Sequence, residues 1–154
     1  MPRFKTPKDY ALWLLSCREY TVKKLRDKCI EKFPEESDEI ENLITFFVQK
    51  EYLSDKRFAE NFIRAQVRQG QGRQKIFMKL LQKGVPKEVI EAQLDLSLTQ
   101  EDVLGPATKL LNKKSDQLRK RYPEITDYEL NQKLTAYLAG RGYGYGEIKE
   151  ILSL

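Results

Sequence analysis

Three segments of this sequence repeat one helical pattern, and that repetition constrains the fold more than any other feature. The segments begin at Leu25, Ile76 and Leu134, and each has an apolar residue four positions later and a basic residue after seven. Apolar residues at positions i and i+4 lie on one face of a helix. A further aliphatic residue follows each segment, at Ile40, Ile90 and Ile148. We interpret the pattern as three tandem units of three helices each.

Helix start and stop signals divide the chain into nine expected helices. Hydroxyl side chains that can accept a hydrogen bond from a first helical turn stand at Thr6, Ser54, Thr99 and Thr126. Pro7 and Pro86 are expected at first helical positions, and Gly84 and Gly142 stand where a left-handed residue would end a helix. The expected helices span residues 7–17, 21–33, 35–50, 55–69, 72–83, 86–96, 100–121, 127–141 and 145–153.

Strand signals are absent, so the expected fold class is all-α, built from three tandem three-helix (helix-turn-helix-like) repeats. The expected units cover residues 1–54, 55–98 and 99–154, and the third begins with the longest helix. A unit of this size buries little surface, so neighbouring units must pack together to be stable. We therefore expect an elongated, curved molecule.

The composition argues against catalysis. The sequence has no histidine, which excludes histidine-based triads and histidine-ligated metal sites. Cys17 and Cys29 cannot form a four-thiolate zinc site, and two cysteines suit a reducing compartment. No stretch approaches the roughly 18 apolar residues needed to cross a bilayer. We expect a cytoplasmic, monomeric protein that is not an enzyme and uses no cofactor or metal.

Positive charge is concentrated in the middle of the chain. The net charge is +5, and residues 56–100 hold 9 Lys or Arg against 4 Asp or Glu. The basic candidates in the two helices expected at 55–69 and 72–83 are Arg57, Arg64, Arg68, Arg73, Lys75, Lys79 and Lys83. A second cluster, in the helix expected at 100–121, comprises Lys113, Lys114, Arg119, Lys120 and Arg121. Solvated helix faces normally carry charges of both signs. The sequence predicts that the polar sides of the helices at 55–69 and 72–83 carry mainly basic residues. The pattern favours an acidic partner, either nucleic acid or an acidic protein face, over a merely solvated surface.

Two glycine-rich segments have a structural and a functional interpretation. Gly70-Gln71-Gly72 lacks the surroundings of a dinucleotide site or a P-loop, so we interpret it as a tight turn between helices. The segment 140–146 resembles an RNA-binding Arg-Gly tract in composition, although a connection with tyrosines packed beneath it fits better. Tyr143 or Tyr145, if exposed, could stack on a base.

The middle unit resembles the RecX family, the regulatory proteins of bacterial RecA recombinase. The resemblance rests on Leu53-Ser54-Asp55-Lys56-Arg57-Phe58-Ala59, followed by Arg68, Gly70-x-Gly72, Ile76, Leu80 and Lys83-Gly84-Val85. The opening of the first unit, from Ala11 to Leu25, is also similar to that family. Within this signature we assign Asp55 to helix initiation beside Ser54, and we assign packing and turn roles to Phe58, Ala59, Gly70, Gly72, Ile76, Leu80 and Gly84.

The resemblance implies a function without catalysis. RecX-like proteins are extended, all-α tandem repeats that bind in the groove of the RecA–DNA filament. They inhibit its ATPase, coprotease and strand-exchange activities, and so regulate recombination, DNA repair and the SOS response. The basic residues named above would then face acidic filament surface or the bound DNA strand, with weak, salt-sensitive binding to free single- or double-stranded DNA.

A different class of function also fits the pattern. The units could belong to a general nucleic-acid-binding protein whose helix at 72–83 or 127–141 enters a major groove. The helix at 72–83 offers lysines, which suit phosphate contacts better than the bidentate reading of bases. A sequence-specific footprint on DNA would favour this alternative.

Overall fold

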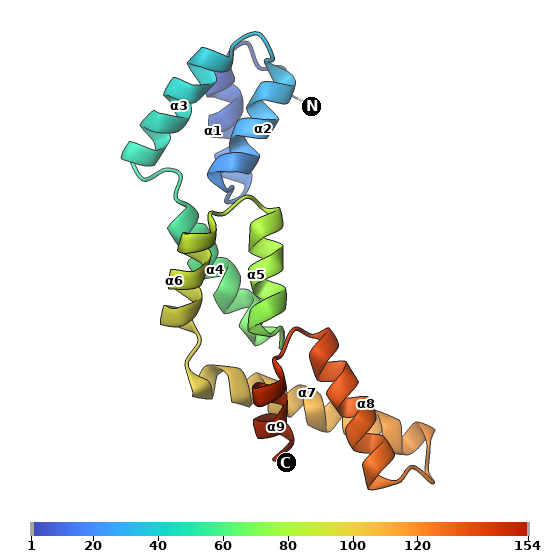
Figure 1. Ribbon diagram of the computed structural model, residues 1–154. Helices are drawn as coiled ribbons and strands as arrows, with labels where there is room; N and C mark the ends of the chain where they lie inside the picture. Colours follow the sequence, from blue (N-terminus) through green and yellow to red (C-terminus); the bar gives the residue numbers. More distant parts are fainter. Residues whose placement is uncertain (1, 154) are drawn as a thin grey trace.

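The computed structural model describes residues 2–153, and over that range the chain forms nine α-helices and no strand. The helices are α1 (Pro7–Cys17), α2 (Val22–Lys32), α3 (Ser37–Gln49), α4 (Asp55–Arg68), α5 (Arg73–Gln82), α6 (Lys87–Ser97), α7 (Gln100–Arg121), α8 (Asp127–Gly140) and α9 (Tyr145–Leu152). Every helix boundary lies within two residues of its expected position. The all-α class is therefore confirmed, and Figure 1 shows an elongated molecule with the three groups of helices arranged end to end.

The helices begin where side chains can accept hydrogen bonds from the first turn. Thr6, Ser54 and Thr99 each accept a bond from a backbone N–H three residues later, at 3.2–3.3 Å. Thr126 and Glu129 form the expected reciprocal capping box, with bonds of 3.2 Å and 3.0 Å. The expectation for Pro86 was wrong: its ψ of 142° is extended, so Pro86 precedes the first turn of α6 as its N-cap residue.

The repeated pattern forms the hydrophobic cores. In the first two units, Leu25 and Cys29 of α2 and Ile76 and Leu80 of α5 are completely buried. Their counterparts in α8 are Leu134, 4% exposed, and Leu138, which is fully buried. The later aliphatic residues and the preceding alanines are buried as well: Ile40, Ile90, Ile148, Ala11, Ala59 and Ala107. Each unit thus packs around the positions that the sequence repeats.

Hydrogen bonds between side chains and backbone join the first unit directly to the second. The Asp55 carboxylate, at the start of α4, accepts a 2.9 Å hydrogen bond from the Val22 N–H in the first turn of α2. The buried Thr21 hydroxyl donates a 2.6 Å bond to the Lys83 carbonyl at the end of α5. The role assigned to Asp55 from the sequence therefore needs correction, because its side chain caps a helix of the neighbouring unit, whereas Ser54 caps α4.

The joint between the second and third units consists of two glycine-rich turns packed against each other. The Gly72 N–H donates a 2.7 Å bond to the Arg141 carbonyl, and the Gln74 N–H donates a 3.2 Å bond to the Gly142 carbonyl. The Arg141 guanidinium donates a third bond, of 3.0 Å, to the Gln69 carbonyl. The backbone lies in the left-handed region at Gly142, with a φ of +94°. Both glycine-rich segments are therefore connections, as expected, and they also hold the two units together.

Candidate functional site

The arginines of α4 line a cleft of mixed charge. Arg64 and Arg68, together with Lys56, border a cavity of about 750 Å³ between α4, α6 and the start of α7. Three acidic residues border the same cavity: Glu60, Glu101 and Asp102. Arg64 is already paired with Glu60 at 2.9 Å. The polar side of α4 is thus mixed rather than purely basic, which corrects the sequence interpretation, because Glu60 lies one helical turn before Arg64.

Two other basic candidates take part in ion pairs within the protein. The Arg57 guanidinium lies 3.6 Å from the Glu19 carboxylate and donates a 2.9 Å bond to the Glu51 carbonyl. Arg73 pairs with Asp95 at 2.7 Å. These arginines tie α4 and α5 to neighbouring segments, so their charge is already partly compensated before any partner binds.

Lys79 and Lys83, at the C-terminal end of α5, continue a row of lysines that begins on α2. Figure 1 shows α2 and α5 end to end along the same side of the molecule. Two adjoining cavities, each of about 460 Å³, lie along this side and share Lys24 and Lys83 as lining residues. The first is also lined by Lys28 and the second by Lys79. We call these two cavities, with their four lysines, the lysine track.

Aromatic rings hold part of the lysine track in place. Phe58 and Phe62 of α4 stack on each other, with ring centroids 6.1 Å apart and an angle of 12° between the planes. The Lys83 ammonium lies 6.0 Å from the Phe58 centroid and 5.5 Å from that of Phe62, within range of a cation–π interaction. Lys79 donates a 3.0 Å bond to the Gln66 side chain. Lys79 and Lys83 are therefore oriented by α4, and their ammonium groups keep donors for a ligand.

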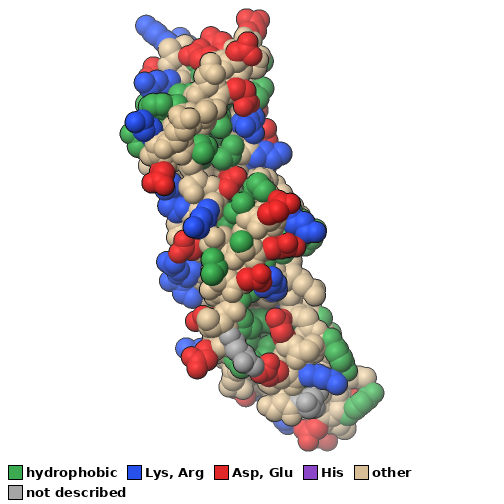
Figure 2. Space-filling model, turned by 60° about the vertical axis from the view of Figure 1, so that its left-hand side comes forward, with side chains coloured by type: hydrophobic (Ala, Val, Ile, Leu, Met, Phe, Trp, Pro, Cys, Tyr) green, Lys and Arg blue, Asp and Glu red, His purple; other side chains and the backbone are tan. Residues whose placement is uncertain are grey.

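The charge balance distinguishes the lysine track from the α4–α6–α7 cleft. Arg18 joins the four lysines, and Glu19 is the one acidic residue among the side chains that line the two cavities. The Glu19 carboxylate already accepts two 3.2 Å bonds from Asn61 and lies beside Arg57. On the face that Figure 2 presents, by contrast, acidic and basic side chains are interspersed. The track is thus a concave surface with a local excess of positive charge, and its chemistry suits an anionic partner.

Comparison with known proteins identifies the family. The family model described as "RecX, second three-helix domain" matches residues 54–94, and "RecX, third three-helix domain" matches residues 107–152. The chain is 37% identical over 138 residues to "Regulatory protein RecX" of Pasteurella multocida, an alignment that covers 88% of this chain and 79% of that protein. The chain belongs to the RecX family. The resemblance noted in the sequence is therefore confirmed.

Other RecX proteins match over most of this chain. The "Regulatory protein RecX" of Clostridium botulinum is 35% identical over 149 residues, which cover 90% of this chain and 68% of that protein. The protein of the same name from Clostridium perfringens is 38% identical over 138 residues, and there the alignment spans 63% of the relative's length. The crystal structure of RecX from Lactobacillus salivarius superposes with a TM-score of 0.84 at 24% identity, covering 96% of this chain and 92% of that one. This likeness supports the fold of three-helix repeats.

The second basic cluster lies apart from the lysine track, on the long helix α7 of the RecX third domain. Arg119 pairs with Asp127 at 3.3 Å. Lys114 and Arg121 lie over the rings of Tyr137 and Tyr122, at 5.2 Å and 5.5 Å from the centroids. Within the described residues, the exposed side chains of Lys113 and Lys120 make no hydrogen bond or ion pair. These bases form a separate surface, and the structure does not bring them together with those of α5.

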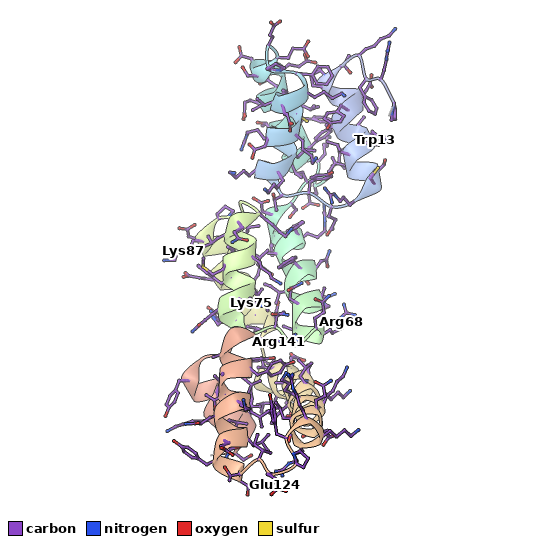
Figure 3. All side chains as sticks on the ribbon, turned by 90° about the vertical axis from the view of Figure 1, so that its right-hand side faces the viewer. Trp13, Arg68, Lys75, Lys87, Glu124 and Arg141 are labelled. Atoms are coloured by element: carbon purple, nitrogen blue, oxygen red, sulfur yellow. The ribbon has the colours of Figure 1, made fainter. Side chains whose placement is uncertain are left out.

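The remaining candidates belong to the joint between the second and third units. Figure 3 shows Lys75 near Arg141 at this joint, and the Lys75 ammonium donates a 3.3 Å bond to the Gly140 carbonyl. Tyr143 is only 4% exposed, and burial raises the pKa of its hydroxyl, so it packs beneath the connection. Tyr145 is 72% exposed, with the Lys149 ammonium 4.9 Å from its ring centroid. Of the two tyrosines, only Tyr145 presents a ring to solvent.

The described residues hold neither a candidate metal site nor a membrane-spanning helix. They contain no group of three or more His, Cys, Asp or Glu side chains placed to hold a metal ion. Cys17 is exposed, whereas Cys29 lies in the core of the first unit, where burial raises the pKa of its thiol to about 11. None of the helices over residues 2–153 combines the length and the apolar character needed to span a membrane.

Sequence reasoning missed the half of the lysine track that α2 contributes. Arg18, Lys24 and Lys28 lie in the first unit. Residues 1–55 hold 10 basic and 11 acidic residues, so their net charge gave no sign of a local excess of positive charge. One signal was present in the sequence: Lys24 and Lys28 are four residues apart and therefore share a helix face. Their proximity to Lys83 depends on the packing of the two units, which local patterns do not encode.

Proposed function

We propose that this RecX-family protein regulates RecA by binding RecA–DNA filaments, and that it inhibits their ATPase, coprotease and strand-exchange activities without catalysing a reaction itself. The protein would act in the cytoplasm, as a monomer and without a cofactor, in recombination, DNA repair and the SOS response. The observation that carries the proposal is the lysine track, a positively charged concave surface along one side of an elongated family member. The name shared by the relatives, "Regulatory protein RecX", supports the same function.

The elongated shape explains how such a protein could bind a filament. We propose that the units end near residues 54 and 98, so that the lysine track crosses the first boundary and the basic cluster of α7 lies beyond the second. Several weak contacts made together by linked units give a much higher affinity than any one of them alone. The track and the α7 cluster would then contact different parts of the acidic filament.

ATP hydrolysis by RecA on DNA tests the proposed function. We expect sub-stoichiometric amounts of the protein to inhibit this hydrolysis. The double variant Lys79→Gln, Lys83→Gln should require about tenfold more protein for half inhibition, because two charge contacts with the filament are lost. Absence of inhibition at every ratio of the wild-type protein to RecA would refute the proposal. Coprotease and strand-exchange assays under the same conditions test the other two activities.

The alternative of a sequence-specific reader of DNA has less support. The side chain of Lys75 is bonded at the joint with the third unit, and Lys79 and Lys83 are oriented by α4. Such side chains favour contacts to phosphates over the reading of base edges in a major groove. A sharp, sequence-specific footprint on duplex DNA would support this alternative instead.

A further inference from the structure

The lysine track carries its lysines in two pairs, each with a spacing of about one helical turn. Lys24 and Lys28 are four residues apart on α2, and Lys83, the C-cap residue of α5, lies four residues after Lys79. Four residues of an α-helix advance about 6 Å along the axis. Because Lys24 and Lys83 line both cavities, the row continues across the joint between the first two units. Positive charges spread along two adjoining cavities fit a linear polyanion better than a small anion, which would need its ligands around one point.

The floor of the lysine track is aromatic. Phe58 lines the cavity on the side of α2, and Phe62 lines the cavity on the side of α5. Both rings are half-buried, and the Lys83 ammonium lies over them. Proteins that bind single-stranded nucleic acid combine a positive groove that follows the backbone with aromatic rings that contact the bases. An acidic protein segment would use the lysines but would gain little from aromatic rings at this position.

We propose that the lysine track binds a single DNA strand, whose phosphates contact Lys28, Lys24, Lys83 and Lys79 in that order while its bases or sugars pack against Phe62 and Phe58. The strand would bridge the first two units along one side of the molecule. The assignment deepens the proposed function, since it identifies the component of a RecA–DNA filament that the track contacts. It also stands as a binding property of the free protein.

Fluorescence anisotropy of the full-length protein with fluorescein-labelled oligothymidylate, measured over a salt series, tests the assignment. Each phosphate contact on a single strand contributes about 0.7 to the slope of log affinity against log salt. Four contacts therefore predict a slope of about −3. The double variant Lys24→Gln, Lys83→Gln should reduce the magnitude of the slope by about 1.4 and weaken binding about tenfold at about 0.1 M salt.

Matched variants distinguish binding at the lysine track from nonspecific electrostatic attraction to the rest of the protein. The double variant Lys5→Gln, Lys8→Gln removes the same charge from exposed positions just before and at the start of α1, away from the residues that line the track, and it should leave the slope unchanged. Phe62→Leu should weaken binding about fivefold with an unchanged slope, because it removes a stacking surface and no charge. Thermal unfolding of each variant confirms that it is folded.

Four outcomes would overturn the assignment. An unchanged slope in Lys24→Gln, Lys83→Gln would place the strand elsewhere. Polyglutamate of matched charge that binds as tightly, with the same lysine dependence, would make the track a site for acidic protein segments. Equal affinity for duplex DNA, or no effect of Phe62→Leu, would exclude recognition of a single strand. Because these measurements contain no RecA, failure of the assignment is distinguishable from failure of the proposed regulatory function.

Discussion

Replacing Gly72 by alanine should lower the free energy of unfolding by about 3 kcal/mol and loosen the joint between the second and third units. A Cβ at this position would lie 2.5 Å from both the Gly142 carbonyl oxygen and the Tyr143 amide nitrogen, and closer still to the Gly142 carbonyl carbon. These are backbone atoms, so no flexible side chain can move aside. The φ of −86° at Gly72 suits alanine, and the expected cost therefore comes from the close approach of the two turns.

Gly146→Ala is the matched control for this variant. Nothing lies within 4 Å of a Cβ built at Gly146, which is in the first turn of α9. Alanine should therefore leave the free energy of unfolding unchanged or raise it by about 0.5–1 kcal/mol. Urea denaturation measures both variants, and limited proteolysis reports opening at the 70–72 and 141–143 turns. Equal stability of Gly72→Ala and the wild type would show that the two turns are not packed as described.

The first link from sequence to structure, the formation of individual helices, was predictable because its determinants are local. A hydroxyl such as Ser54 bonds to an N–H three residues away, and Gly84 has a φ of +86° where α5 ends. Such signals depend only on residues that are close together in the sequence. The repeated apolar positions predicted the cores for the same reason, since Ile76 and Leu80 share one face of their own helix.

Contacts between units could not be predicted, because they depend on how separate helices pack. The sequence alone placed Asp55 beside Ser54 at a helix start, whereas its carboxylate reaches the first turn of α2. Likewise Gly72 was recognised as part of a turn, but its partner Gly142 is 70 residues away along the chain. The same limit applies to the lysine track, whose two halves come from different units.

The basic residues also show why a sum of charge over sequence is a weak guide to a binding surface. Arg64 and Arg73 were singled out in the most basic segment, yet each is paired with an acidic residue in the folded protein. Lys24 and Lys28 come from a segment with no excess of bases, yet they line a cavity with one acidic neighbour. Folding redistributes charge among surfaces, so the positive site follows from packing rather than from composition.

The joint between the first and second units should depend on the Asp55 side chain as a hydrogen-bond acceptor rather than as a charge. Asp55→Ala should lower the free energy of unfolding by about 1–2 kcal/mol, because the Val22 N–H in the first turn of α2 loses its partner. Asp55→Asn keeps an acceptor oxygen and should retain most of that stability at neutral pH. Urea denaturation of the two variants separates the roles of hydrogen bond and charge.

The pH dependence of Asp55→Asn supplies the second half of this test. Burial raises the pKa of the Asp55 carboxyl above its ordinary value, and this effect exceeds the opposing effects of the Val22 N–H bond and of Arg26. The folded protein therefore holds this proton more tightly than the unfolded chain does. The stability that protonated Asp55 contributes is fully present below the unfolded pKa, about 3.9, and is lost as the pH rises through the higher folded pKa. As the pH rises from the unfolded pKa to the folded pKa of Asp55, the wild type should therefore lose stability relative to Asp55→Asn.

Asp38→Asn is the control, since Asp38 is exposed in the first turn of α3 and its carboxylate makes no hydrogen bond or ion pair within the described chain. Removing this charge from an exposed position should change the free energy of unfolding by less than about 0.5 kcal/mol. If the wild type instead gained stability relative to Asp55→Asn as the pH rose, the Val22 bond and Arg26 would outweigh burial. The carboxylate charge itself would then stabilise the joint between the first two units, and with it the continuity of the lysine track.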